Sequence, residues 1–111
     1  MDETVDFLKE YDIPSAKVLM DVFHMNIEEV SISESIRKYA DWLGYFHVVD
    51  SNRLYPSAGH VDFDAVFAAL SDIQYAGYVS LECMPKPDGE TAAKRALAYI
   101  NQFRRAQGCM Q

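Results

Sequence analysis

The sequence predicts an α/β fold in which three parallel strand–helix units follow a short helix. Short apolar segments alternate along the chain with segments of helical periodicity. Each apolar segment is almost continuously hydrophobic, which is typical of strands in a parallel sheet covered by helices. Of the 111 residues, 50% are hydrophobic, which is enough for a packed core. No linker or low-complexity stretch interrupts this order, so we expect a single domain over residues 1–111.

The first predicted elements are a helix over residues 3–11 (ETVDFLKEY) and a strand over residues 17–23 (KVLMDVF). Pro14 is expected to end the helix, because proline cannot continue it. The strand segment is apolar, rich in β-forming residues and short enough to be buried.

The next predicted element is a helix over residues 31–44 (SISESIRKYADWLG). Ser31 and Glu34 are spaced as a capping box at its start, and Gly44 is a plausible stop. Its apolar face consists of Ile36, Tyr39, Ala40 and Leu43.

The strand–helix unit then recurs twice. Residues 45–50 (YFHVVD) and 78–83 (YVSLEC) predict strands, and residues 63–75 and about 89–106 predict the helices after them. One face of the first helix carries Phe63, Val66, Phe67, Leu70 and Ile73, and the second carries Ala93, Leu97, Ile100 and Phe103. The last two strand–helix units are each about 31 to 34 residues long, a length that suits both a closed β/α barrel and an open doubly wound sheet.

Charge and composition exclude several classes of function. The net charge is −7, so nucleic acid and anionic membranes would be repelled, and we expect neither as a partner. No apolar run approaches the roughly 20 residues that span a bilayer, and the start MDETVDF is acidic, unlike a signal peptide. Cys83 and Cys109 are too few for a disulfide framework; we expect free thiols and a cytoplasmic location.

Polar side chains interrupt or follow each predicted strand near its carboxyl end, where parallel β/α proteins place their functional groups. Buried ionisable groups are costly unless they are paired or bound to a metal. The joint pattern therefore predicts a site. The candidates are Asp21 and His24 at the end of the first strand, His47 and Asp50 at the end of the second with Asn52 and Arg53 just beyond it, and Glu82 at the end of the third.

The ligand set formed by Asp21, His47 and Glu82 has a chemical preference. One imidazole and two carboxylates without a thiolate suit Mn²⁺, Mg²⁺ or Co²⁺, with waters or substrate oxygens completing the shell. A closed structural zinc site would use more sulfur or nitrogen. A sugar carbonyl and its neighbouring hydroxyl, chelated by such a metal, would gain an acidified C–H that a carboxylate could remove.

Each of these residues, taken alone, also has a purely structural explanation. Asp21 and His47 would fit a core in which hydrogen-bond partners satisfy them, and His24 would fit as a packed histidine. Glu82 would fit as the ion-pair partner of Arg53. Only the joint pattern favours a functional site.

Three segments make the chain resemble the sugar phosphate isomerase/epimerase family, the xylose-isomerase-like TIM barrels that include the ketose 3-epimerases. Residues 19–29 (LMDVFHMNIEE) are similar to the sixth strand segment of that family. Residues 46–63 (FHVVDSNRLYPSAGHVDF) resemble its seventh strand and loop, and residues 78–100 (YVSLECMPKPDGETAAKRALAYI) its eighth strand and final helix. The resemblance implies a partial (β/α)8 TIM barrel of three parallel β/α units preceded by a helix.

The resemblance also implies roles for five residues. Asp21, His47 and Glu82 match three of the four metal ligands of the family. Glu82 also matches one of two glutamates that exchange the substrate proton through a cis-enediolate. His24 and Arg53 match residues that hold substrate oxygens. The implied activity is the divalent-metal-dependent isomerisation or epimerisation of a sugar or sugar phosphate.

One departure from the family pattern limits this expectation. In the family, the fourth ligand and second catalytic glutamate lie at the end of the fifth strand, and strands one to five have no counterpart here. We therefore expect either a fragment or a free-standing reading frame for the C-terminal part of a barrel. Three strands cannot close a barrel, so we expect a homodimer that buries the former interior, or pairing with the missing N-terminal half. The alternatives are a metal- or sugar-binding module without turnover and an oligomeric barrel remnant.

Overall fold

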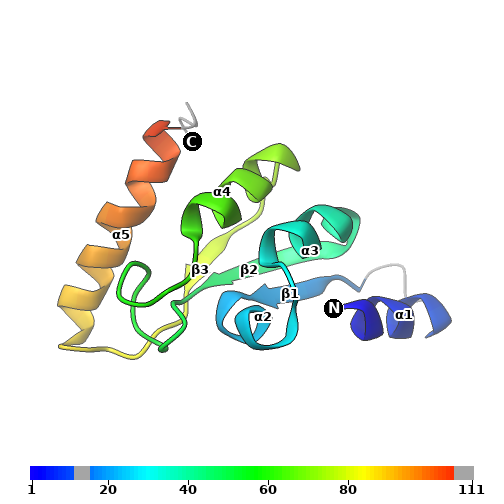
Figure 1. Cartoon of the computed structure of the whole chain (residues 1–111), viewed down its shortest axis with the longest axis horizontal. Helices are drawn as coiled ribbons and strands as arrows, with labels where there is room; N and C mark the ends of the chain where they lie inside the picture. The colour runs from blue at the N-terminus through cyan, green and yellow to red at the C-terminus, as the bar shows by residue number, and fades with distance from the viewer. Residues whose placement is uncertain (12–15, 107–111) are drawn as a thin grey trace.

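Three parallel strands form the centre of the structure, with helices before, between and after them (Figure 1). The structure is a computed structural model that describes residues 1–11 and 16–106. Pro14 and Cys109, for which we predict a helix stop and a free thiol, lie outside the described residues. The elements are α1 (Asp2–Tyr11), β1 (Val18–Asp21), α2 (Val22–Glu28), α3 (Ile32–Lys38), the 3₁₀ turn η1 (Ala40–Trp42), β2 (Leu43–Val48), α4 (Phe63–Asp72), β3 (Val79–Leu81) and α5 (Gly89–Ala106).

The strands lie in the order β1-β2-β3, and both neighbouring pairs are parallel, as predicted. In this register Asp21 lies opposite His47, and His47 lies opposite Ser80. Because all three strands run in the same direction, their carboxyl ends meet at one edge of the sheet. The sheet thus brings the candidate residues of β1 and β2 to the same level.

The two faces of the sheet differ in burial. Helices α3 and α4 pack side by side along one face (Figure 1). That covered face carries Val18, Met20, Phe46 and Val48, each at most 4% exposed. On the opposite face, Leu19 is 52% exposed and Tyr45 is 39% exposed. Alternation along the strands therefore separates a helix-covered core face from an open inner face.

Helix α5 packs on α4 through aromatic side chains. The rings of Phe67 and Phe103 stack with their centroids 4.8 Å apart. Tyr99 meets Phe63 and Phe103 edge to face, at 6.0 and 5.0 Å. Such pairs stabilise a contact beyond the area that they bury, so α5 is anchored along the outer side of α4.

The predicted strand over residues 17–23 is too long, and its last part is helical. The strand ends at Asp21, and α2 begins at Val22. The reason is a helix cap: the Asp21 carboxylate accepts the backbone N–H groups of Phe23 and His24 at 2.9 and 3.4 Å. Burial of Val22 and Met25 then holds the helix against the core.

The predicted helix over residues 31–44 is also too long. Its start is confirmed, since Ser31 accepts the N–H of Glu34 at 3.2 Å. The helix ends at Lys38, however, and Gly44 belongs to β2. The strand register shifts there, and a Cβ on Gly44 would clash with the side chain of Lys17. A glycine in a strand commonly marks such a bulge or close approach.

The remaining predicted elements are confirmed, most of them with changed bounds. The first helix begins at Asp2, and the predicted strand over residues 45–50 lies two residues earlier, at Leu43–Val48. The predicted helix over residues 63–75 ends at Asp72, and the predicted strand over residues 78–83 is reduced to Val79–Leu81. The last helix runs over Gly89–Ala106, as expected. In the described part of the chain, no helix combines the length and the apolar character that crossing a membrane requires.

We expect the two faces of β1 to respond oppositely to truncation. Met20→Ala should lower the free energy of unfolding by about 2–5 kcal/mol, because it opens a cavity in the core. Leu19→Ala, one residue away on the open face, should lower it by less than about 1 kcal/mol. Urea unfolding followed by circular dichroism at low protein concentration measures both. Equal losses would contradict the assignment of the two faces.

Candidate functional site

Asp21 and His47 lie side by side at the carboxyl ends of β1 and β2. The Asp21 Oδ2 and His47 Nδ1 atoms are 3.6 Å apart, and the two side chains are 12% and 19% exposed. This separation is longer than a hydrogen bond, so the carboxylate and the imidazole face one another without a direct hydrogen bond. A mostly buried carboxylate and imidazole therefore meet where the sequence predicts a site.

Neighbouring groups fix the orientation of both side chains. The Asp21 Oδ1 atom caps α2, which leaves Oδ2 turned toward His47. The His47 ring meets the ring of Tyr45 edge to face, with centroids 5.2 Å apart. The Tyr45 hydroxyl in turn shares a hydrogen bond of 2.8 Å with the Ser80 hydroxyl. The inner face thus carries a polar layer that links β2 to β3 beside His47.

Glu82, the third expected ligand, is not brought into this group. It follows β3, where its N–H donates to the Val48 carbonyl at 3.1 Å, and it is exposed. Ser80, not Glu82, is the residue in register with His47. Among the residues that the structure describes, no three His, Cys, Asp or Glu side chains are close enough to hold a metal ion. The described chain therefore assembles two of its three expected ligands.

His24 and Arg53, the expected substrate-binding residues, both contact the ring of Phe23. The Arg53 guanidinium carbon lies 4.2 Å from the centroid of the Phe23 ring. The ring of His24 meets Phe23 edge to face at 5.5 Å. His24 is exposed and belongs to α2, not to the end of the strand as predicted. An ion pair between Arg53 and Glu82, the structural alternative, is not among the ion pairs of the described residues.

Asp50, another strand-end candidate, has its carboxylate committed to the loop that follows it. The side chain is fully buried. Its Oδ1 atom accepts the N–H groups of Ser51 and Val61 at 2.7 and 3.1 Å, and its Oδ2 atom accepts that of Ser57 at 2.9 Å. The prediction that Asp50 is offered to the site beside His47 is wrong, because backbone donors of its own loop occupy both oxygens.

Cys83 is a free thiol next to Glu82. Burial raises the pKa of the Cys83 thiol above its ordinary value, and the charge of the Glu82 carboxylate raises it further. The thiol therefore stays protonated at neutral pH, which makes it a poor nucleophile.

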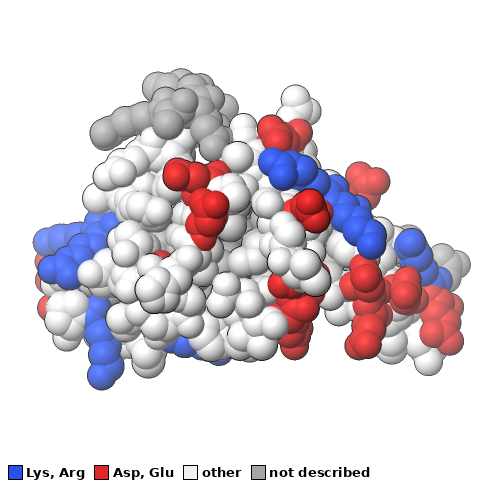
Figure 2. All heavy atoms as spheres, in the orientation of Figure 1, with Lys and Arg blue, Asp and Glu red and all other residues white. Residues whose placement is uncertain are grey.

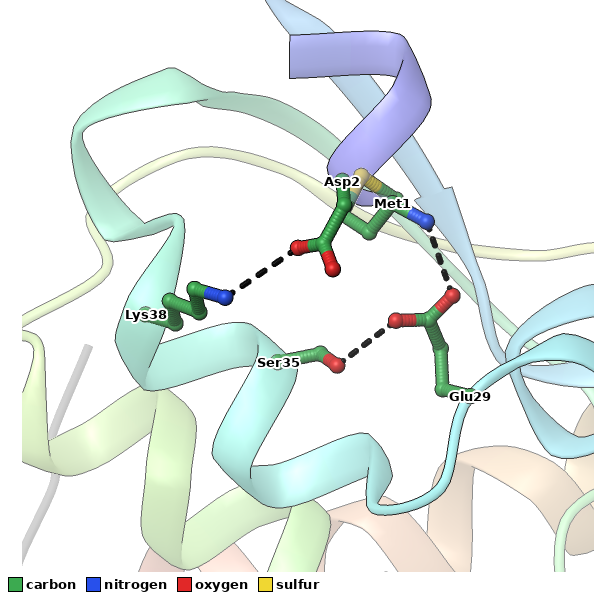
Figure 3. Close-up of polar contacts among 5 residues, drawn as sticks. All are labelled: Met1, Asp2, Glu29, Ser35 and Lys38. Carbon is green, nitrogen blue, oxygen red and sulfur yellow. Dashed lines mark hydrogen bonds and ion pairs between the residues drawn. The ribbon is translucent and has the colours of Figure 1, made fainter. Parts of the chain in front are cut away.

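A separate cleft of about 550 Å³ lies between the start of α1 and the start of α3. None of the candidate residues at the strand ends lines it. Acidic side chains gather over α1 beside it (Figure 2). Figure 3 shows the Glu29 carboxylate between the N-terminal amine of Met1, at 2.9 Å, and the Ser35 hydroxyl, at 2.7 Å. Lys38 pairs with Asp2 at 3.2 Å.

These contacts explain the electrostatics of the cleft. Burial of Glu29 disfavours its charged form, but the hydrogen bonds from the terminal amine and from Ser35 outweigh it and lower the pKa of this carboxyl. The charged groups of the cleft thus join α1 to α3 and to the turn before it. This cleft is explained by packing between helices, and the candidate site remains at the strand ends.

The arrangement of parallel strand–helix units with polar residues at the carboxyl ends of the strands is that of the β/α barrels. The chain belongs to the xylose isomerase-like TIM barrel family, whose model matches residues 1–103. This membership confirms the family resemblance that the sequence predicts.

Named relatives include sugar epimerases. The chain is 44% identical over 80 residues to a D-psicose 3-epimerase from Ruminiclostridium cellulolyticum. The aligned region covers 72% of this chain and 27% of that protein. The chain is 42% identical over 80 residues to an L-ribulose 3-epimerase from Methylomonas sp., covering 72% and 28%. A crystal structure of D-allulose 3-epimerase from Methylomonas sp. in complex with D-allulose superposes with a TM-score of 0.83 at 35% identity, covering 90% of this chain and 41% of that one. The chain thus spans about a quarter of the length of the curated relatives.

We expect the charge of Glu82 to control the reactivity of Cys83. In a Cys109→Ser background, Glu82→Gln should lower the pKa of the Cys83 thiol and speed its alkylation by iodoacetamide at pH 7.5 by about twofold, as expected when a solvent-exposed neighbouring charge is removed. Mass spectrometry over time measures the rate. Glu90→Gln, the same charge change on α5, is the control and should leave the rate unchanged. Equal acceleration by both variants would show that only net charge matters.

Proposed function

We propose that this chain carries part of the active site of a divalent-metal-dependent sugar epimerase or isomerase. One observation carries the proposal: Asp21 and His47 face each other at 3.6 Å on the inner face, at the carboxyl ends of paired strands. The family of the chain adds support, because its relatives are named for the epimerisation of D-psicose and L-ribulose.

The donor atoms fit the proposed metal in kind. A carboxylate oxygen and an imidazole nitrogen suit Mn²⁺, Mg²⁺ or Co²⁺. The Asp21 Oδ2 atom is not used by the helix cap, and the Oδ2–Nδ1 separation leaves the two groups without a direct hydrogen bond. We propose Glu82 as the third ligand; its exposed side chain is not held by an ion pair among the described residues.

The proposed reaction is proton transfer next to a sugar carbonyl. When bound, the metal would polarise that carbonyl and acidify the adjacent C–H. In this proposal the Glu82 carboxylate removes or returns the proton through an enediolate, and His24 and Arg53 bind substrate oxygens. An ionised carboxylate such as Glu82 can accept the proton and, once protonated, give it back.

Complete turnover needs a second proton-transfer group, because epimerisation takes a proton from one face of the carbon and delivers it to the other. One general acid–base group is typically worth about 10²–10⁴-fold in rate. We propose that the second group comes from a complementing N-terminal barrel half, which would also cover the open inner face. The substrate in this proposal is a sugar or a sugar phosphate.

A second candidate function is an oligomeric module that binds a metal or a sugar without turnover. The exposure of Leu19 and Tyr45 on the inner face favours it, because this apolar surface would be covered in a homodimer. The two candidates differ in one property: the first gains epimerase activity when the missing half is supplied, and the second does not.

Calorimetric titration with Mn²⁺ tests the proposed site. We expect the chain to bind Mn²⁺, and we expect Asp21→Asn and Glu82→Gln each to raise the Kd by about tenfold or more, because each removes an anionic ligand. Asp21→Asn is informative because asparagine caps helices about as well as aspartate does, so α2 should persist.

Glu28→Gln is the matched control for the titration. Glu28 is an exposed carboxylate at the end of α2, and its loss removes the same charge without touching the proposed ligands. Its Kd should equal that of the unmodified chain. The proposal fails if the chain binds no Mn²⁺, or if all three variants bind it equally well.

A further inference from the structure

The Asp50 carboxylate is buried at the end of β2 but is not one of the proposed metal ligands. It is fully buried, and no ion pair among the described residues includes it. Backbone N–H groups of the following loop compensate it instead, from Ser51, Ser57 and Val61. A buried charge is costly unless hydrogen bonds satisfy it, and hydrogen bonds to a charged acceptor are strong. The carboxylate therefore serves as the anchor around which residues 51–61 fold.

The same residue also starts the turn that carries Arg53. The Asp50 N–H donates to the Leu54 carbonyl, and the Arg53 N–H donates to the Asp50 carbonyl, both at 3.0 Å. Arg53 has a φ angle of 68°, in the left-handed region that residues other than glycine rarely adopt. Such a conformation persists only where its surroundings impose it. The loop anchored by Asp50 supplies that constraint.

From this conformation Arg53 makes two contacts with other parts of the candidate site. Its guanidinium lies over the ring of Phe23 on α2, at 4.2 Å. Its backbone carbonyl accepts the N–H of Met84 at 2.8 Å, two residues after Glu82. The Arg53 backbone and side chain thus join the start of α2 to the segment that leaves β3.

We propose that Asp50 is a positioning residue that holds Arg53 over Phe23 and, through the Arg53 carbonyl, fixes the segment that carries Glu82. The inference rests on the proposed function only in giving Arg53 and Glu82 their roles toward substrate. The positioning itself concerns contacts within the free chain and is measured without metal or sugar.

Asp50→Asn is the direct test. Its amide keeps one acceptor oxygen but places an N–H₂ donor against a backbone donor, so the loop loses at least one anchoring bond. Gly59→Ala perturbs the same anchor without changing any charge, because a Cβ there would collide with the Asp50 carboxylate. Asp62→Asn is the matched control, since Asp62 is exposed and, among the described residues, its side chain accepts only the N–H of Ala65 at the start of α4.

Two NMR readouts report the position of Arg53 and of the Glu82 segment. The ring current of Phe23 should move the Arg53 side-chain protons upfield, and Phe23→Leu sets the zero of that displacement. Hydrogen exchange of the Met84 amide reports its bond to the Arg53 carbonyl. In Asp50→Asn and Gly59→Ala we expect the upfield displacement to fall by more than half and Met84 exchange to rise by about tenfold. Asp62→Asn should change neither readout.

Amide exchange in β1 and β2 separates positioning from a loss of the fold. The proposal requires hydrogen exchange of the Met84 amide to speed up more than exchange of the amides in these strands. It is overturned if both readouts stay unchanged in Asp50→Asn and Gly59→Ala, or if Met84 exchange speeds up only by the same factor as exchange in the strands. If Asp50→Asn does not fold, Gly59→Ala decides by the same criteria. A failure to bind Mn²⁺ would count against the proposed function and leave this result standing.

Discussion

The parallel pairing of β1 with β2 is the constraint on which the candidate site depends. Side chains alternate between the faces of a strand, so burial of Met20 and Phe46 under the helices commits Asp21 and His47 to the opposite face. A slip of one residue in one strand would move one of these polar side chains into the core, which makes the register strongly specified. Packing of the apolar core on one face of the sheet therefore fixes the positions of Asp21 and His47 on the other face.

The junction between β1 and α2 adds a second constraint at the same place. One oxygen of Asp21 caps the helix and the other faces His47, so the start of α2 fixes the rotation of the carboxylate. The helix then presents Phe23 and His24 beside it, and the Phe23 ring supports Arg53 from the next loop. A single short turn thus connects backbone capping, the proposed ligand and the proposed substrate contacts.

Much of this arrangement could be predicted from the sequence, because hydrophobic periodicity reports burial directly. The alternation of strands and helices, the parallel sheet and the placement of Asp21 and His47 at strand ends all follow from it. The start of α2 is partly indicated by the sequence, because aspartate is a preferred capping residue. A helix of 7 residues, however, is too short to show a clear hydrophobic period. The bulge at Gly44, the contact of Arg53 with Phe23 and the bond from Val61 to Asp50 depend on residues brought together only by tertiary structure.

Paramagnetic line broadening by Mn²⁺ in the NMR spectrum tests most directly whether strand pairing builds the site. The account predicts that substoichiometric Mn²⁺ broadens first the amide signals next to Asp21 and His47, then those near Glu82, and leaves α1 and the cleft around Glu29 unaffected. Broadening centred on the acidic surface of α1 or on Glu29, with the signals around Asp21 and His47 still sharp, would contradict it.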